Sequence, residues 1–534
     1  METITTFRNE PLRDFSEERN RSDMEVALSE VESLIRSKAL HAAPIVAGRR
    51  REGEEPMQRR DPSNTSVVVG TTELASVKLA EEAMLSCLAG FPGWRARPFS
   101  ERAAILQRAA GILKEKSAFL AALIVREAGK PWREADADVA EAIDFCAYYA
   151  QEMLRVGPAR RTQDVLGEDN VLLYQPRGVA AVISPWNFPL AITCGMAAAA
   201  LVTGNTVILK PAEQTGLIAH ELARVFFDAG VPADALAFLP GRGETVGRFL
   251  VEHPSTALVA FTGSRPVGLE IAKAAAEVRP GQRGLKRVIA ELGGKNAIIV
   301  DDDADFDDAI RGVLQSAFGF AGQKCSACSR LIVVGDAYEP FLARLAAAMR
   351  DIIVSRAEDP SAFLGPVIDE ESQARIASVI EAGEQQCPVL AQAVLPQEVS
   401  RSGTFVAPTI FRDVPSTSAL WTDEIFGPVL ACARAATFEQ ALEMAVASDY
   451  ALTGGVYSRH PGHIEKAREH FRVGNLYINR SITGALVGRQ PFGGFAFSGI
   501  GSKAGGPDYL LQFLEPRVVT ENTMRRGFSP DLTS

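Results

Sequence analysis

The sequence predicts an α/β protein with two doubly wound parallel sheets, and three observations lead to this fold class. From about residue 178, short apolar runs alternate with helical runs, each pair about 25 to 30 residues long, which is the pattern of strand–helix–strand units. A second alternation of the same kind extends from about residue 295 to 475. The 534 residues also suffice for about two to four domains.

The elements are expected in a fixed order along the chain. Residues 1–60 are polar and predict an N-terminal arm with a helix near 23–37. Helical spacing predicts helices over 74–89, 99–128 and 134–154. Apolar runs predict first-sheet strands at 179–183, 206–209, 235–239, 258–261 and 287–290, and second-sheet strands at 297–300, 331–334 and 454–457. A Gly-rich tail begins at residue 481 and contains a last strand over 513–520.

Composition and charge argue against several classes of protein. The 66 Asp and Glu outnumber the 56 Lys and Arg, so nucleic acid and anionic membranes are not expected as main partners. Seven scattered cysteines, an odd number, are typical of free thiols in a cytoplasmic protein. The charged first 30 residues do not resemble a signal peptide. Pro185, Pro189 and Gly204 interrupt the uncharged stretch between Arg177 and Lys210, so no membrane span is expected there.

Four loops follow strands of the first predicted sheet, at the edge where parallel sheets bind ligands. Singly, each is best explained as an ordinary strand-to-helix turn. Together they predict a dinucleotide site, since helix N-termini suit a pyrophosphate and a lysine with an acid suits a ribose. The four loops contain, in chain order, Ile183 to Pro189, Leu209 to Glu213, Gly241 to Gly247 and Phe261 to Gly268.

Cys325 is the candidate nucleophile. It follows a turn of small residues, and the neighbouring Lys324 is expected to favour the thiolate. Three alternatives compete with this role. Cys325 and Cys328 could form a redox disulfide, although they do not follow the first strand of a thioredoxin-like unit. They could also form half of a zinc site, although no second pair has suitable spacing, or they could be inert core residues.

A nucleophilic cysteine usually needs a base, and no histidine lies in a convincing site-like loop. Glu291 is the better candidate, because it ends a predicted strand next to two glycines that let backbone approach a ligand. Burial raises the pKa of a carboxylate, so such a group can act near neutral pH. Asn187 adds an uncharged donor that could face a developing oxyanion.

The acidic run at 301–308 suggests a calcium loop, but the pattern fails. That loop requires Gly at its sixth position and Glu at its twelfth, and Phe306 and Gly312 stand there. Acids at a helix start complement the helix dipole, which explains the run without a metal. No metal is expected elsewhere either.

Six motifs occur in the order found in aldehyde dehydrogenases, and the chain resembles that family from about residue 60 to its end. They are PWNFP at 185–189, KPAE at 210–213, FTGS at 261–264, ELGG at 291–294, GQKC at 322–325 and EIFGP at 424–428. Within the family, residues 482–494 and 503–509, with 7–12 and 322–330, resemble the members that act on glutamate γ-semialdehyde. One departure is Ala496, where the family often has Lys.

The resemblance implies an aldehyde dehydrogenase-like fold divided in a particular way. Beyond the arm, residues 61–160 and 179–290 would form a Rossmann-like NAD-binding domain and 291–480 a catalytic domain. Residues 161–178 and 481–534 would supply an oligomerisation hairpin, a substrate-anchor loop and the C-terminal tail. The family generally forms dimers or larger assemblies, so a homo-oligomer is expected.

The resemblance also implies roles, position by position. Cys325 matches the nucleophile, Glu291 the base for deacylation, and Asn187, with the backbone amide of Cys325, the oxyanion hole. Matches to the cofactor site are Ile183, Ser184, Pro185, Trp186, Lys210, Ala212, Glu213, Gly241, Gly243, Phe261, Thr262, Gly263, Ser264, Leu292, Glu424 and Phe426. Matches to the substrate site are Phe188, Lys324, Ser326, Gly484, Ala485 and Phe492. The cofactor is expected to be NAD, because Glu213 would repel the 2′-phosphate of NADP.

The implied reaction is the NAD-dependent oxidation of L-glutamate γ-semialdehyde, which equilibrates with 1-pyrroline-5-carboxylate, to L-glutamate through a Cys325 thioester. The reaction belongs to proline catabolism, so a functional link to a proline dehydrogenase is plausible. A first alternative keeps the chemistry but uses another semialdehyde or an aliphatic aldehyde. A second alternative, a non-catalytic binding protein, predicts loss of Cys325, Glu291 or Asn187, and all three are present.

Overall fold

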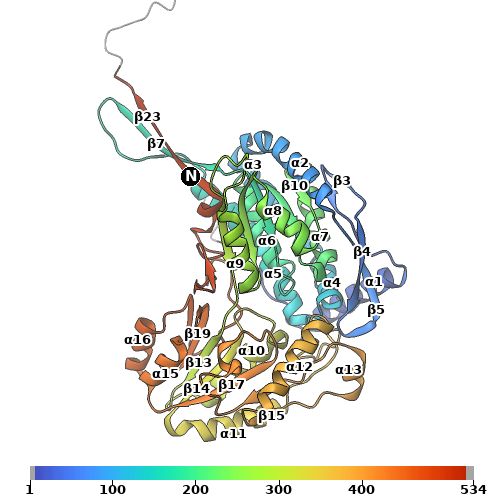
Figure 1. Ribbon diagram of the computed structural model, residues 1–534, viewed down its shortest axis with the longest axis vertical. Helices are drawn as coiled ribbons and strands as arrows, with labels where there is room; N and C mark the ends of the chain where they lie inside the picture. Colours follow the sequence, from blue (N-terminus) through green and yellow to red (C-terminus); the bar gives the residue numbers. More distant parts are fainter. Residues whose placement is uncertain (1–6, 525–534) are drawn as a thin grey trace, which may run out of the picture.

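Two large sheets form the body of the protein and confirm the predicted fold class (Figure 1). The structure is a computed structural model that describes residues 7–524. In the first sheet, five parallel strands occupy the centre, and short antiparallel strands flank them. The order is β22 (Gly499–Ile500), β12 (Arg287–Glu291), β11 (Thr256–Thr262), β8 (Val179–Ile183), β9 (Thr206–Lys210), β10 (Leu236–Phe238), β2 (Ile45–Val46) and β3 (Arg49–Arg50).

Helices cover both faces of this sheet, so its central strands read as continuous apolar runs. Every residue of β8 is buried, with Ala180 and Val182 in one core cluster and Ala181 and Ile183 in the other. The first cluster includes α1 (Glu18–Arg36), α3 (Phe99–Glu115), α4 (Ser117–Ala128), α5 (Trp132–Val156), α6 (Ala191–Val202) and α7 (Gly216–Asp228). The second includes α2 (Val77–Ala96), α8 (Arg248–Glu252) and α9 (Arg265–Ala276).

The second sheet is parallel except for its edge strand β15. Its order is β15 (Val389–Gln392), β16 (Thr409–Phe411), β17 (Val429–Ala435), β14 (Cys328–Val334), β13 (Asn296–Val300), β19 (Thr453–Tyr457) and β20 (Asn475–Ile478). Its helices include α10 (Phe306–Phe318), α11 (Tyr338–Met349), α12 (Glu370–Glu384), α14 (Ala419–Thr422), α15 (Phe438–Val446) and α16 (Pro461–His470), and the short α13 (Gln397–Ser402) lies before β16.

A third, three-stranded sheet extends away from the body (Figure 1). It consists of β6 (Arg160–Arg161), β7 (Glu168–Pro176) and β23 (Leu514–Asn522), all antiparallel. The predicted hairpin and last strand therefore lie side by side. The predicted tail continues to residue 534, and its part after residue 524 lies outside the described residues.

Two predictions about the N-terminal third need correction. The single helix expected over 99–128 is two helices, α3 and α4, because Lys116 leaves the helical conformation with φ −89° and ψ 5°. Residues 1–60 do more than form an arm with a helix. They also form β1 (His41–Ala42) and most of β4 (Glu55–Asp61), whose polar residues hide the strand pattern. The next strand, β5 (Asn64–Leu74), has no predicted counterpart, although it contains Val67, Val68 and Val69.

In the part of the chain from residue 7 to 524, no helix is long and apolar enough to cross a membrane.

Candidate active site

Cys325 lies in a loop whose backbone is tightly constrained. The preceding 3-10 helix η3 (Gly319–Gly322) contains left-handed residues, with φ +51° at Phe320 and +68° at Gly322. A Cβ at Gly322 would overlap the carbonyl group of Gly427, so the glycine permits a close approach of two loops. On the other side, Asn296 donates from Nδ2 to the carbonyl oxygen of Cys325 at 2.7 Å. The position of the Cys325 backbone is therefore fixed from both sides.

A cavity next to Cys325 collects residues from the first sheet, from the loop before β14 and from the tail. The helices α5 and α6 contribute Phe145, Tyr149 and Ile192 to its wall. Predicted site residues also line it, namely Phe188, Thr262, Glu291, Cys325, Ser326, Gly484, Ala485 and Phe492. The catalytic candidates Cys325 and Glu291 thus share one cavity with substrate-side candidates that are far away in the sequence, whereas Asn187 is not part of the cavity wall.

The thiol of Cys325 is held in its protonated form. Burial raises its pKa most, and the carboxylates Glu424 and Glu291 raise it further, while the backbone amides of Ser326 and Cys325 lower it. The thiolate expected from the neighbouring Lys324 is therefore not the resting form. The reason is that the Lys324 ammonium turns to Glu134 and binds its Oε1 at 2.7 Å. A base is needed to generate the nucleophile.

Glu291 provides a suitable base. It ends β12, and burial raises its pKa to about 8, while Lys503 acts in the opposite direction. Within residues 7–524, no group donates a hydrogen bond to the buried Oε2 of Glu291. The Lys503 ammonium is bound instead by the carbonyl oxygens of Gly474 and Gly493, at 2.6 and 2.7 Å, and by Asn475 Oδ1 at 3.0 Å. One carboxylate oxygen of Glu291 is thus left to accept a proton.

Asn187 is fixed by a buried ion pair that sequence reasoning missed. Its Nδ2 donates to the carbonyl oxygen of Gln323 at 3.0 Å, which points the amide at the Cys325 loop. The backbone carbonyl oxygen of Asn187 accepts a hydrogen bond from Lys130 Nζ at 2.9 Å. Lys130 Nζ also binds Asp138 Oδ2 at 2.9 Å. Lys130 and Asp138 are fully buried, and the ammonium lies 3.9 Å from the centre of the Phe188 ring.

The loop containing Gly484 and Ala485 presents open backbone amides. Gly484 has φ +75°, and no atom lies within 4 Å of an ideal Cβ there. Within the described residues, no group accepts a hydrogen bond from the backbone amide of Gly484 or of Ala485. The Ser326 hydroxyl and these amides are the kind of donors that capture a carboxylate. Phe188 and Phe492 add aromatic surface to the same cavity.

The predicted cofactor residues gather at the carboxyl edge of the first sheet. Lys210 Nζ binds Glu213 Oε1 at 3.0 Å, and the amide of Gly243 donates to the same oxygen at 2.8 Å. No atom lies within 4 Å of an ideal Cβ at Gly243, so space remains above this loop. Ser264 precedes α9 without a side-chain cap, which leaves the first amides of that helix open. This donor set suits a pyrophosphate beside a ribose.

The loop between α14 and β17 contributes Glu424 and Phe426 to this region. Glu424 Oε1 accepts from the amide of Gly294 at 2.9 Å, and burial raises its pKa to about 7. The ring of Phe426 meets Trp186 edge to face, with ring centres 5.5 Å apart. A side chain at Gly293 would overlap the Glu424 carboxylate, so this contact requires glycine.

Some of the predicted site residues contact other parts of the protein instead of lining the substrate cavity or the cofactor edge. Gly241 packs against Val246, and Leu292 packs against Gly268 of α9. Lys324 binds Glu134 and is absent from the cavity wall described above. The remaining cofactor candidates lie on these same loops. Ile183 is the last residue of β8, and Ser184 and Pro185 follow it, directly before Trp186. Ala212 precedes Glu213, and the segment from Phe261 through Thr262 to Gly263 leads into α9.

Sequence reasoning missed Lys130, Asn296 and Lys503. Lys130 lies between two helices, Asn296 starts β13 and Lys503 lies in the tail. Lys503 belongs to a segment, 503–509, that the resemblance had singled out, so a signal for it existed. Lys130 and Asn296 stand in no motif that distinguished them.

Cys328 has a different environment from Cys325. It begins β14 and is buried in the core of the second sheet, where its Sγ donates to the carbonyl oxygen of Arg330 at 3.3 Å. Burial raises its pKa to about 12. It is not part of the cavity wall described above. This environment is that of an inert core thiol.

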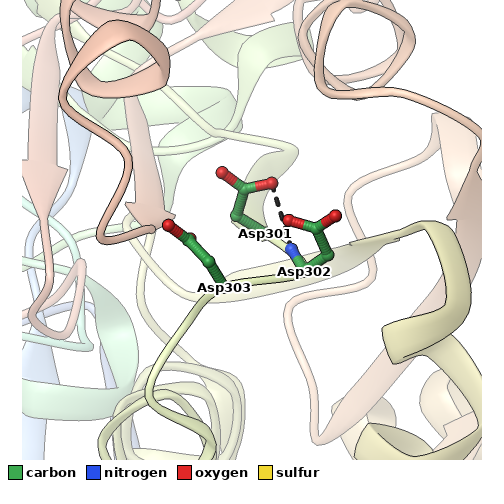
Figure 2. Close-up of side chains that lie close together, drawn as sticks. All are labelled: Asp301, Asp302 and Asp303. Carbon is green, nitrogen blue, oxygen red and sulfur yellow. Dashed lines mark hydrogen bonds between the residues drawn. The ribbon is translucent and has the colours of Figure 1, made fainter.

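The acidic run is already bonded within the protein. Figure 2 shows Asp301, Asp302 and Asp303 close together after β13, the one group in residues 7–524 with metal-ligand spacing. Asp301 Oδ2 accepts from Ser458 Oγ at 2.7 Å and contacts His463 Nδ1 at 2.6 Å. Further along, Asp305 caps α10 by accepting from two backbone amides. Helix capping and internal hydrogen bonds thus account for the run.

Comparison with known proteins identifies the class. The sequence profile of the aldehyde dehydrogenase family matches residues 49–519, and the chain belongs to this family. A 1-pyrroline-5-carboxylate dehydrogenase of Geobacillus sp. (strain WCH70) is 46% identical over 518 residues, which cover 97% of this chain and 99% of that protein.

Two solved structures are also similar. The crystal structure of 1-pyrroline-5-carboxylate dehydrogenase from Thermus with bound NAD is 45% identical, has a TM-score of 0.94, and covers 97% of this chain and 100% of its own. Proline utilization A (PutA) from Bdellovibrio bacteriovorus is 47% identical, with a TM-score of 0.95 over 98% of this chain. This chain spans 54% of the length of that protein.

Proposed function

We propose that this protein is an NAD-dependent dehydrogenase that oxidises L-glutamate γ-semialdehyde, in equilibrium with 1-pyrroline-5-carboxylate, to L-glutamate. One observation carries the proposal. The cavity that contains Cys325 and Glu291 also contains Ser326 and the open amides of Gly484 and Ala485. A nucleophile and a base thus share a cavity with donors for a carboxylate, as a substrate with an aldehyde and a carboxylate requires.

The rest of the cavity fits the same substrate. The aliphatic part of the molecule would lie against Phe188 and Phe492, which both line the wall. Near-full-length similarity to proteins named 1-pyrroline-5-carboxylate dehydrogenase supports this choice over another semialdehyde or an aliphatic aldehyde.

The cofactor would bind at the carboxyl edge of the first sheet. Open amides at the start of α9 would hold the pyrophosphate beside the free space at Gly243, with Lys210 and Glu213 at one ribose and Glu424 at the other. Glu213 disfavours a 2′-phosphate by charge, which selects NAD over NADP. When bound, NAD accepts the hydride that the substrate loses. The Thermus relative is a structure with bound NAD, which supports this assignment.

Acylation depends on three groups of the chain. Glu291 takes the proton of the Cys325 thiol, and the sulfur then forms a bond with the aldehyde carbon. The aldehyde oxygen becomes an oxyanion that accepts hydrogen bonds from Asn187 Nδ2 and the Cys325 amide. Removing one such donor typically costs about 10²–10³-fold in rate. When the hydride has left, the carbonyl re-forms as a thioester on Cys325.

Deacylation uses Glu291 a second time. After releasing the first proton to solvent, its carboxylate takes a proton from water, and the hydroxide attacks the thioester carbon. The carbon–sulfur bond breaks, the Cys325 thiolate leaves, and glutamate is released. The open Oε2 of Glu291 suits this role, since no donor in the described part of the chain occupies it.

The test is NADH formation by purified protein with pyrroline-5-carboxylate, with propanal and succinate semialdehyde measured in parallel. We expect saturable turnover that strongly favours pyrroline-5-carboxylate. Turnover of another aldehyde alone would keep the Cys325 chemistry but overturn the role of the Gly484 loop. If no aldehyde is oxidised, the proposed activity is wrong.

We also propose that the enzyme is a cytoplasmic homo-oligomer, a dimer or an assembly of dimers, with a functional link to a proline dehydrogenase. The three-stranded sheet extends away from the body, with Val518 exposed on β23 and Leu166 exposed in the loop between β6 and β7, which supports a contact with a second copy. The similarity to proline utilization A supports the link to proline oxidation. Seven free cysteines support the location.

A further inference from the structure

Residues 7–13 cross the outside of α5, and we call this segment the N-terminal strap. Its backbone binds two aspartates of α5: the amide of Glu10 donates to Asp144 Oδ1 at 2.7 Å, and the amide of Arg13 donates to Asp136 Oδ2 at 2.8 Å. The neighbouring face of α5 carries Phe145, which lines the cavity. The strap therefore packs on a helix that forms a wall of the substrate site.

Asn9 connects this helix to the loop that presents the open amides. One N–H of its side chain donates to Asp144 Oδ2 at 2.7 Å, and Nδ2 also donates to the carbonyl oxygen of Val487 at 2.9 Å. An amide nitrogen has two hydrogens, so both are used. Asp144 and Val487 are both buried.

A second contact of the strap reinforces the first. The Phe7 ring lies beside Gly488, where an added Cβ would come within 3.2 Å of it. The same ring meets Tyr148 of α5 edge to face, with ring centres 5.1 Å apart. Phe7 and Asn9 thus both touch α5 and the loop that follows Ala485. Elsewhere the loop is held by the amide of Gly488, which donates to the carbonyl oxygen of Gly505 at 2.8 Å.

We propose that the N-terminal strap is a specificity-determining part of the substrate site, with Asn9 as the positioning residue. By binding Asp144 and Val487 together, Asn9 fixes the loop of Gly484 and Ala485 relative to α5 and hence relative to Cys325. A donor that is displaced by even a small distance loses much of its hydrogen bond to a ligand. This inference rests on the proposed function, in which that loop binds the substrate carboxylate.

The kinetic test compares Asn9→Ala with Asn20→Ala. Asn20 is a partly exposed asparagine whose Nδ2 donates to the carbonyl oxygen of Asp14, outside the strap, so it is a matched control. In Asn9→Ala we expect the KM for pyrroline-5-carboxylate to rise about tenfold, the scale of one hydrogen bond to a charged group. We expect kcat and the KM for propanal, which has no carboxylate, to stay within about twofold.

The variant Asn9→Asp keeps the size of the side chain but removes both donors. It places a carboxylate against Asp144 and the Val487 carbonyl, so its KM for pyrroline-5-carboxylate should rise at least as much as that of Asn9→Ala. An unchanged KM in both variants, or an equal rise for propanal, would overturn the inference.

Hydrogen exchange of the free enzyme tests the strap without using activity. Amides of residues 484–490 should exchange faster in Asn9→Ala than in the wild type or Asn20→Ala. If loop exchange is unchanged, the strap does not hold the loop and the inference is wrong. Failure of the proposed function would show differently, as wild-type enzyme that does not oxidise pyrroline-5-carboxylate.

Discussion

Cys325 and Cys328 are close in sequence, but the fold gives them different chemistry. Cys325 opens onto the cavity, whereas Cys328 is buried in the second sheet. Cys325→Ala should lower turnover by at least about 10³-fold while the affinity for NAD stays the same. Cys328→Ala should retain turnover within about threefold, with a loss of stability of about 1 kcal/mol.

Steady-state kinetics and NAD titration of both variants check this prediction. Full activity of Cys325→Ala would end its assignment as the nucleophile. A folded but inactive Cys328→Ala would revive the redox pair as an explanation of the two cysteines.

Glu291 predicts how activity depends on pH. Only the carboxylate form can accept a proton, and burial raises the pKa of Glu291 to about 8. Activity should therefore rise with pH, with a midpoint near about 8, and level off above it. In Glu291→Gln the pH-dependent rise should disappear, and kcat should fall about 10²–10⁴-fold.

The measurement is kcat between about pH 6 and 10 for both proteins. A rapid burst of NADH in Glu291→Gln, followed by slow turnover, would place the defect in deacylation alone and contradict the role of Glu291 in deprotonating Cys325. A wild-type profile without a rise in this range would contradict the role of Glu291 as the base.

At the scale of elements, Lys130 joins α5 to the loop before α6. It binds Asp138 of α5 and the carbonyl oxygen of Asn187, and Asp138 Oδ1 accepts from the amide of Ala191 at 2.7 Å. Breaking a buried ion pair by removing one partner costs about 3–5 kcal/mol. Lys130→Met should therefore lower the free energy of unfolding by about that amount and reduce kcat by more than about tenfold.

Urea unfolding and kcat measure these two effects, with the exposed Lys78→Met as the matched control. Adding Asp138→Asn to Lys130→Met removes the unpaired charge but keeps an acceptor for Ala191. The double variant should regain stability without regaining kcat, because the backbone carbonyl oxygen of Asn187 still lacks the hydrogen bond that Lys130 donates. Recovery of both would show that Lys130 acts on stability alone.

At the scale of the whole molecule, the projecting sheet predicts the assembly. Val518 of β23 is 63% exposed on a sheet that stands away from the body (Figure 1). A charge at the centre of an apolar interface is costly, so Val518→Glu should reduce the mass of the particle in solution. The control is Val26→Glu on α1, where the valine is similarly exposed at 65%.

Light scattering of the two variants and the wild type checks this prediction. The wild type and Val26→Glu should have the same oligomeric mass, and Val518→Glu a lower one. A monomeric wild type would remove the basis for the proposed contact.

The sequence by itself determined the features that depend on neighbouring residues. The alternation of apolar strands with helices predicted both sheets, because strand and helix periods are local patterns. The motifs around Asn187, Glu291 and Cys325 could be recognised because each lies within a short segment. Local patterns failed where polar residues form a strand, as in β4, since packing against the rest of the fold outweighs local preference there.

Tertiary structure alone decided the contacts between distant segments. Lys324 turns to Glu134, 190 residues away, rather than to the neighbouring Cys325. Asn9 reaches Val487 across 478 residues, and Lys130 reaches Asn187 across 57. A side chain bonds whichever partner the folded chain brings near and shields from water, and a single sequence gives no local sign of that partner.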